Sequence, residues 1–269
     1  MKLISKPLFK QTLKSNWKLW AAITGVMALL LIMITGVMGS VITKRLADNP
    51  GMAGMMGANN PMAVASNMFY GQMAVMIILV YVIITANALV ASQVDKGSMS
   101  YTLSTPIKRT TVTMTQMIYL LGSLLASSLV LIVSHVLGSL IGGITINFGQ
   151  IILVNLGLFL LSCAIAGISF MASCIFNLSK NSLLIGAGVP VLFYVFSMVA
   201  QMGEPSVPGM DGIPALANFK YVTIMSLFNT SDIAAKSSNI IWSFIALALI
   251  AIVTFTIGHL IFKKKDLPL

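Results

Sequence analysis

The sequence predicts an all-α integral membrane protein with six transmembrane helices and both termini in the cytoplasm. Two features of its composition predict this class: of 269 residues, 58% are hydrophobic and 8% are charged. Because soluble domains are roughly a quarter charged, this chain has too little polar surface to fold as a globule in water. The third feature is the clustering of its apolar residues into six runs that contain no Asp, Glu, Lys or Arg.

Each apolar run is long enough to cross a hydrocarbon core of about 30 Å as a helix. We expect one transmembrane domain at 19–262, preceded by an interfacial helix at 1–18 and followed by a basic tail at 263–269. The first run is longer than the apolar core of a signal peptide, and no clear cleavage site follows it, so we expect it to be retained. The predicted spans are 19–42, 72–92, 117–141, 151–175, 182–202 and 240–262.

The distribution of positive charge predicts the orientation, since cytoplasmic loops are enriched in Lys and Arg. With the N-terminus inside, the outer segments hold only Lys44, Arg45, Lys220 and Lys236 of the 16 basic residues. The net charge of +10 therefore reports topology, and we expect a multi-pass protein of the cell membrane. We expect no nucleic-acid partner, because basic and aromatic residues are not interleaved as in single-stranded nucleic-acid sites.

The segment before the first apolar run has the pattern of an amphipathic helix. Lys10, Lys14 and Lys18 recur every fourth residue and share one helix face, whereas apolar residues such as Phe9 fall largely on the other. We expect this helix to lie on the inner leaflet in contact with membrane lipids. The alternative is a basic anchor without defined helical structure.

Two outer segments are long enough to carry structure of their own. The Met-rich segment 43–71 has thioethers that suit a soft metal, but without His or Cys nearby a flexible loop is the favoured interpretation. The segment 203–239 opens with Pro and Gly and becomes apolar again at 221–228. That apolar stretch is too short to span, so it either re-enters the bundle or lies along the membrane.

Motifs for enzymatic chemistry are missing from the sequence. It has no phosphate-binding P-loop, no HExxH zinc motif and no GxSxG nucleophile. Cys163 and Cys174 are 11 residues apart in one apolar run, beyond disulfide reach on a helix, and indicate core residues. We therefore expect a protein that is not an enzyme and that binds no metal or cofactor of its own.

Several polar or small residues fall inside the predicted spans. For His135, His259, Asn87 and Asn155 we expect hydrogen bonds between helices, with a proton relay or a polar path as the alternative. A glycine pair spaced by four residues, Gly138 and Gly142, favours close helix packing. The residues considered for lining a path are Tyr81, Asn87, Phe170, Tyr194 and Phe196.

The inner loop between the second and third spans reads QVDKGSMSYTLSTPIKR, residues 93–109. It resembles the signature of type-2 ABC transporter permeases, in which an x-x-Gly-Thr turn is followed by Leu-x-x-Pro-x-x-Arg. Gly97 and Ser98 match the turn, Leu103 and Pro106 the middle, and Arg109 the end. The six spans, the cytoplasmic termini and the basic first helix match as well, so the resemblance covers nearly the whole chain.

The loop departs from the family pattern at three positions. Gln93 stands where the family often has Glu, Ser98 where it often has Thr, and Gln116 where Lys is expected. The change at Gln93 removes a charge and puts any salt bridge of that position in doubt, although Asp95 is a candidate substitute. The residues also predict a short helix over 95–103, which Pro106 ends.

The resemblance implies the membrane-spanning subunit of an ATP-driven exporter. A separate cytoplasmic ATPase would bind the ATP, and a second permease protomer would complete a homodimer or a paralogous heterodimer. The apolar spans favour a hydrophobic or amphipathic substrate, drug-like or peptide-like. The residues expected to couple the two subunits are Asp95, Gly97, Ser98, Leu103, Pro106, Lys108 and Arg109.

Two other functional classes fit the same topology. A membrane sensor, immunity protein or scaffold would need no ATPase. An ion-coupled carrier is disfavoured, because no span contains a carboxylate.

Overall fold

The computed structural model describes residues 4–38, 40–41, 44, 61–104, 107–203, 213–235, 237 and 239–265. Within these ranges the chain forms helices and no strands. Six helical stretches are long and apolar enough to cross a membrane, which confirms the predicted number of spans. They are Lys6–Val37, Ala65–Asp95, Arg109–Gly142, Phe148–Ile175, Ser179–Gly203 and Asn239–Lys264.

The described helical elements follow one another in this order along the chain. The first two spans are built from α1 (Lys6–Met33) with the π-helix η1 (Ile34–Met38), and from α4 (Pro61–Met68), the π-helix η2 (Phe69–Met73) and α5 (Ala74–Leu89). The loop helices are α6 (Ala91–Asp95) and α7 (Ser98–Leu103), and the next three spans are α8 (Arg109–Gly142), α9 (Phe148–Ile175) and α10 (Ser179–Gly203). The remaining elements are α11 (Pro214–Ala217), η3 (Asn218–Tyr221), η4 (Ile224–Leu227), α12 (Thr230–Ala234) and α13 (Asn239–Lys264).

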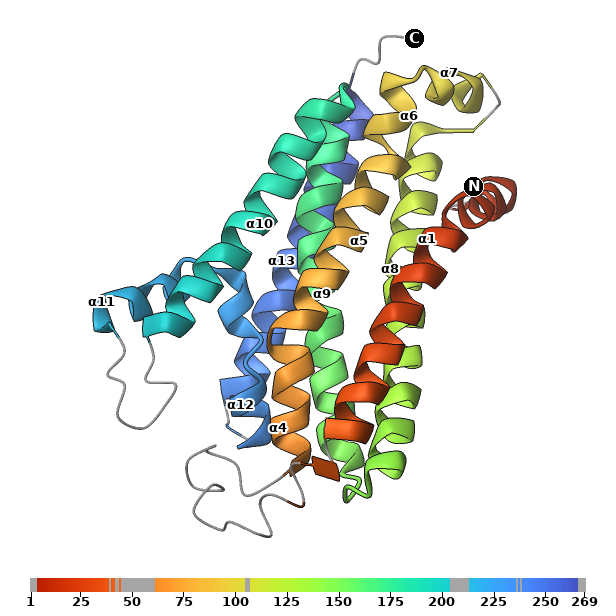
Figure 1. Cartoon of the computed structure of the whole chain (residues 1–269). Helices are drawn as coiled ribbons and strands as arrows, with labels where there is room; N and C mark the ends of the chain where they lie inside the picture. The colour runs from red at the N-terminus through yellow and green to blue at the C-terminus, as the bar shows by residue number, and fades with distance from the viewer. Residues whose placement is uncertain are drawn as a thin grey trace.

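The bundle has two distinct ends. Helices α6 and α7, the C-terminal end of α13 and the first turns of α1 lie toward one end, which we call the α7 end (Figure 1). Helices α4 and α12 and the connection from α8 to α9 lie at the other, the α12 end. This arrangement agrees with the predicted order of inner and outer segments.

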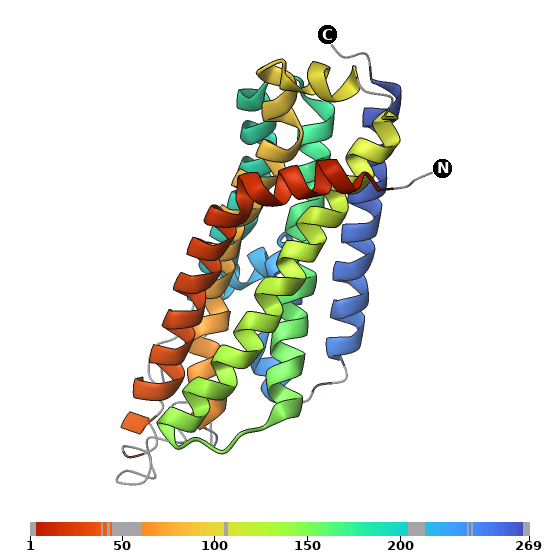
Figure 2. The ribbon, with the colours of Figure 1, turned by 90° about the vertical axis from the view of Figure 1, so that its right-hand side faces the viewer.

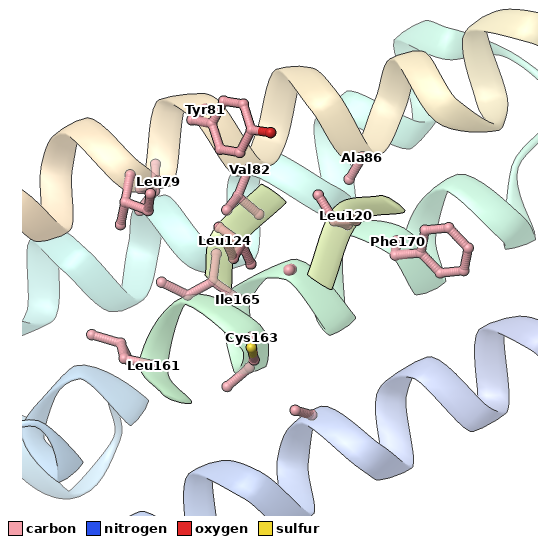
Figure 3. Packing of buried hydrophobic residues seen from close by; sticks show 14 of the residues in the cluster. Leu79, Tyr81, Val82, Ala86, Leu120, Leu124, Leu161, Cys163, Ile165 and Phe170 are labelled. Carbon is pink, nitrogen blue, oxygen red and sulfur yellow. The ribbon is translucent and has the colours of Figure 1, made fainter. Parts of the chain in front are cut away.

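Helix α9 forms the centre of the bundle, where it packs against α5, α8, α10 and α13. Glycines on both sides of its contact with α13 allow this: a Cβ added to Gly167 of α9 would collide with Thr254 of α13, and one added to Gly258 of α13 would meet the Met171 Cα of α9 at 3.0 Å. Close approach through glycine is the usual way in which helices associate within lipid. Figure 3 shows the apolar core that results, with Leu124 of α8 above Ile165 of α9.

The predicted packing of Gly138 and Gly142 is confirmed. A Cβ on Gly138 would collide with the Thr35 side chain, and a Cβ on Gly142 would lie 2.5 Å from the Thr35 backbone oxygen. The two glycines thus allow α8 to pack closely against η1, at the α12 end of the first span.

The first helix begins at Lys6, well before the predicted start of the first span at residue 19. No break separates the two, but the helix bends so that its first turns cross α8 (Figure 2). Thr12 donates a hydrogen bond to Gln116 Oε1 at 3.1 Å, and the Phe9 and Tyr119 rings are 6.1 Å apart. Lys10, Lys14 and Lys18 are exposed. Their contact with membrane lipids remains a prediction.

The segment 213–235 turns back into the bundle, which decides between the two alternatives for the apolar stretch. The Phe228 ring would lie 2.8 Å from a Cβ on Gly157. Gly157 is about 14 Å along α9 from Phe148, at ~1.5 Å per residue. The segment therefore reaches well inside the α12 end and packs between α9, α10 and α13.

Candidate functional site

The loop between the second and third spans forms two short helices at the α7 end. Helix α6 ends at Asp95, and Gly97 adopts φ 71° before α7 begins at Ser98. The short helix expected over 95–103 is present, but it begins at Ser98 and not at Asp95. Glycine adopts positive φ without steric cost, so it divides the helix at this point.

Local hydrogen bonds hold α7 in its new direction. The Ser98 hydroxyl donates to the Gln93 carbonyl at 3.2 Å, and the Gly97 N–H donates to the Val94 carbonyl at 3.0 Å. The Ser100 hydroxyl donates to the Gly97 carbonyl at 2.5 Å. The turn is thus fixed from both sides, and α7 lies across the end of the bundle instead of continuing α6 (Figure 1).

The first half of the loop contacts the start of α10. Asp95 Oδ2 accepts a hydrogen bond from the Ser179 N–H at 3.2 Å. The Asn87 side-chain amide, on α5, donates to the Ser179 hydroxyl at 2.7 Å. Two residues near the loop therefore converge on the first residue of the fifth span.

The second half of the loop contacts the ends of α9 and α13. Arg109 Nη1 donates to the Lys265 carbonyl at 2.6 Å, and Lys265 Nζ donates to the Cys174 carbonyl at 3.0 Å. Burial lowers the pKa of Lys265. Cys174 lies in the last turn of α9, where carbonyls lack helical partners, so the ammonium satisfies one of them.

The predicted coupling residues fall in different settings. Asp95, Gly97, Ser98 and Arg109 make the turn and its contacts, as described above. The Lys108 carbonyl accepts the first helical hydrogen bonds of α8, from Thr111 at 2.9 Å and Val112 at 3.2 Å. Leu103 ends α7, with its side chain outside the described atoms, and Pro106 lies outside the described residues.

One residue of the loop was missed by sequence reasoning. Tyr101 on α7 is 80% exposed, in contrast to the buried Tyr70 and Tyr81 of the second span. An aromatic residue in a polar, inner loop was the available signal. Ser179 and Lys265 were missed too, because only the folded topology brings them to the loop.

The α7 end is strongly basic. Among the described residues at this end, Asp95 is the single acid. The exposed or partly exposed basic residues there are Lys6, Lys10, Lys14, Lys18, Lys96, Lys108, Arg109, Lys180, Lys263, Lys264 and Lys265.

The intramembrane polar residues make contacts between helices, as expected. His135 Nδ1 lies 3.3 Å from the Tyr70 hydroxyl, which donates to Asn155 Oδ1 at 3.3 Å. His259 Nδ1 lies 2.7 Å from the Thr113 hydroxyl. Within the described part of the chain, no three His, Cys, Asp or Glu residues are grouped as metal ligands.

A variant of His135 separates a structural role from a proton relay. We expect His135→Leu to lower stability by about 0.6 kcal/mol or somewhat more, the typical size of an interhelical hydrogen bond in a membrane. If the chain exports a substrate, as the resemblance implies, the pH profile of that export should keep its shape, because the hydrogen-bond chain ends at an amide. Thermal unfolding in detergent and export at several pH values measure both. A changed pH profile would instead favour the relay.

Two of the residues considered for lining a path do not do so within one protomer. Tyr81 is 1% exposed and donates to the Ser123 hydroxyl at 2.7 Å, and Phe170 is fully buried beside Phe255. Both belong to the core (Figure 3). Asn87 binds Ser179, as described, and Phe196 stacks on Phe219, with ring centroids 5.4 Å apart. Tyr194 is partly buried against the core.

No protein-family model matches this chain, and no curated protein matches its sequence.

Proposed function

We propose that this chain is the membrane-spanning subunit of an ATP-driven exporter, and that a separate cytoplasmic ATPase acts on the loop formed by α6 and α7. The observation that carries the proposal is that both halves of this loop are tied to other spans. Asp95 contacts α10, and Arg109 contacts the chain after α13. A displacement of the loop would therefore act on the start of α10 and on the chain that follows α13.

The shape of the loop supports a docking role. Because Gly97 redirects the chain, α7 projects from the spans and presents Tyr101 to the surroundings. Short helices with an exposed aromatic residue suit grooves on partner proteins, and Tyr is enriched among the residues that dominate binding energy. In this proposal Tyr101 anchors the ATPase.

The charge distribution supports a cytoplasmic position for the α7 end. Nearly all described Lys and Arg residues lie there, and a cytoplasmic excess of positive charge is the main determinant of topology. An ATPase that uses cytoplasmic ATP would have to bind at this end. The expected second protomer, as a homodimer or paralogous heterodimer, would place two such loops side by side.

The substrate class follows from the spans. Their surfaces are largely apolar, and the His135, Asn155 and His259 side chains inside them are engaged in contacts between helices. We propose a hydrophobic or amphipathic cargo, drug-like or peptide-like. An ion-coupled carrier is disfavoured, since Asp95 at the loop is the sole carboxylate in the six described spans.

The test is copurification of an ATPase with matched tyrosine variants. Tyr101→Ala should weaken binding of a cytoplasmic P-loop ATPase by about 2 kcal/mol, roughly 30-fold in Kd, as for a central interface residue. Tyr221→Ala is the control, because Tyr221 is equally exposed but lies in the segment after α10. Tagged protein is purified from native membranes in mild detergent, and ATP hydrolysis and bound partners are measured.

The outcome separates the candidate functions. Recovery of an ATPase with the parent chain and with Tyr221→Ala, but not with Tyr101→Ala, supports the exporter. A sensor or scaffold predicts that no P-loop ATPase is recovered with any of the three chains, and that result would overturn the proposal.

A further inference from the structure

The fifth span, α10, begins where Asp95 and Asn87 contact Ser179, and we call this set of contacts the joint. The first N–H groups of a helix lack partners within the helix, and a carboxylate is favourable beside them. Asp95 supplies this carboxylate from the end of α6, at 3.2 Å from the Ser179 nitrogen. Asn87 binds the side chain of the same residue at 2.7 Å. Because Ser179 is the first residue of α10, a pull on it acts along the whole helix.

A weak point lies halfway along α10. Pro190 has no N–H, so it cannot bond the carbonyl four residues earlier, at Gly186. The Ser169 hydroxyl of α9 donates to that carbonyl at 2.7 Å instead. A proline inside a helix is a common site of bending. The helix therefore has two halves with different constraints.

The half between Ser179 and Pro190 is fixed to α9. The Ser182 and Ser173 hydroxyls are 3.0 Å apart, and a Cβ on Gly186 would lie 3.2 Å from the Ala172 Cβ. At its first residue, Ser179, this half also contacts Asp95 of α6 and Asn87 of α5.

The half beyond Pro190 belongs with the segment 213–235. The Thr223 hydroxyl donates to the Phe193 carbonyl at 2.8 Å. Gly203 lies so close to the backbone of Ala217 that a Cβ would collide there. The Gln72 side-chain amide of η2 donates to Gln201 Oε1 at 2.5 Å, and this hydrogen bond connects the second half of α10 to the second span. Figure 1 shows α10 leaning away from the bundle toward α11.

We propose that α10 is the span that carries loop motion to the α12 end, with Asp95 and Asn87 as the positioning residues at its start and Pro190 as its hinge. This inference rests on the proposed function. The contact of Arg109 with Lys265 is a poorer transmitter, because Lys265 follows the last helical residue of α13 and its non-helical backbone absorbs displacement.

The first experiment uses the full chain alone in lipid nanodiscs. Spin labels at Met202 on α10 and Leu140 on α8, both exposed near the α12 end, report the position of α10. We expect a single distance in the parent chain and a broader, shifted distribution in Asp95→Ala/Asn87→Ala.

Asp95→Asn keeps an acceptor oxygen and should retain the parent distribution. A pair at Leu140 and Ile241 on α13 is the control and should be unchanged. Identical Met202 distances in the parent chain and the double variant would overturn the joint.

The second experiment adds the ATPase that copurifies with the chain and traps it with ATP and vanadate. We expect trapping to shift the Met202–Leu140 distance but not the Leu140–Ile241 distance. The shift should be reduced in Asn87→Ala and in Pro190→Ala, although the ATPase stays bound, because neither residue lies in the loop formed by α6 and α7. If the ATPase binds and the Leu140–Ile241 distance changes while the Met202–Leu140 distance does not, the proposed role of α10 is refuted, whereas the proposed exporter function is not. If no ATPase copurifies, the proposed function itself fails.

Discussion

Replacing Gly97 with valine is expected to abolish the proposed ATP-driven export while the six spans stay folded. Gly97 adopts φ 71°, where a β-branched residue is strained by roughly 1–2 kcal/mol or more. The turn would relax to negative φ, and α7 would no longer lie across the end of the bundle. Substrate-stimulated ATP hydrolysis and transport into inverted vesicles measure the loss.

Two further variants make this result specific. Beyond its two chain neighbours, no described atom lies within 4 Å of a Cβ at Gly97, so the effect comes from backbone conformation and not from crowding. Asparagine tolerates the left-handed region best among the larger residues, so Gly97→Asn should keep much of the activity. Gly25→Val, at a helical position that is equally open, should leave export intact. Equal activity of the Val and Asn variants at 97 would contradict the role of the turn.

The second large effect is expected at Gly142, where α8 meets the first span. A Cβ there would lie 2.5 Å from the Thr35 oxygen and 2.9 Å from the Gly36 oxygen. Both are backbone atoms and cannot rotate away, so Gly142→Ala should destabilise the protein by about 1–3 kcal/mol. The melting temperature in detergent, followed by circular dichroism, measures this.

Gly122 provides the matched control for Gly142. It lies in the same helix with nothing within 4 Å of its Cβ. Gly122→Ala should raise stability by up to about 1 kcal/mol, because alanine favours a helix over glycine. The two substitutions are chemically identical and should act in opposite directions. A stable Gly142→Ala protein would show that α8 and η1 are less closely packed than described.

The spans could be read from the sequence because lipid imposes a simple rule. A helix in lipid must make its backbone hydrogen bonds internally and expose apolar side chains. Long apolar runs such as 151–175 and 240–262 can therefore be recognised as spans. The structure extends most spans by a few residues, and the first by many. That extension was not visible, because Lys10, Lys14 and Lys18 suggested a separate surface helix, whereas the chain bends without a helix break.

The loop was predicted in its residues but not in its shape. Gly97 was identified from the family pattern, yet the expected helix ran through it. A positive φ depends on the surrounding chain, and glycine also occurs inside helices. The partners of Asp95 and Arg109 could not be predicted at all, because Ser179 and Lys265 lie 84 and 156 residues away. Contacts of that separation follow only from the packing of the spans.

The contact between Arg109 and Lys265 has a consequence for biosynthesis. The loop emerges from the ribosome after two spans, but its partner at Lys265 is made only after the sixth. A nascent chain in the translocon thus carries the loop without its second anchor. The loop would then reach its final form only once every membrane helix has been inserted, so the proposed ATPase would dock only on completed subunits.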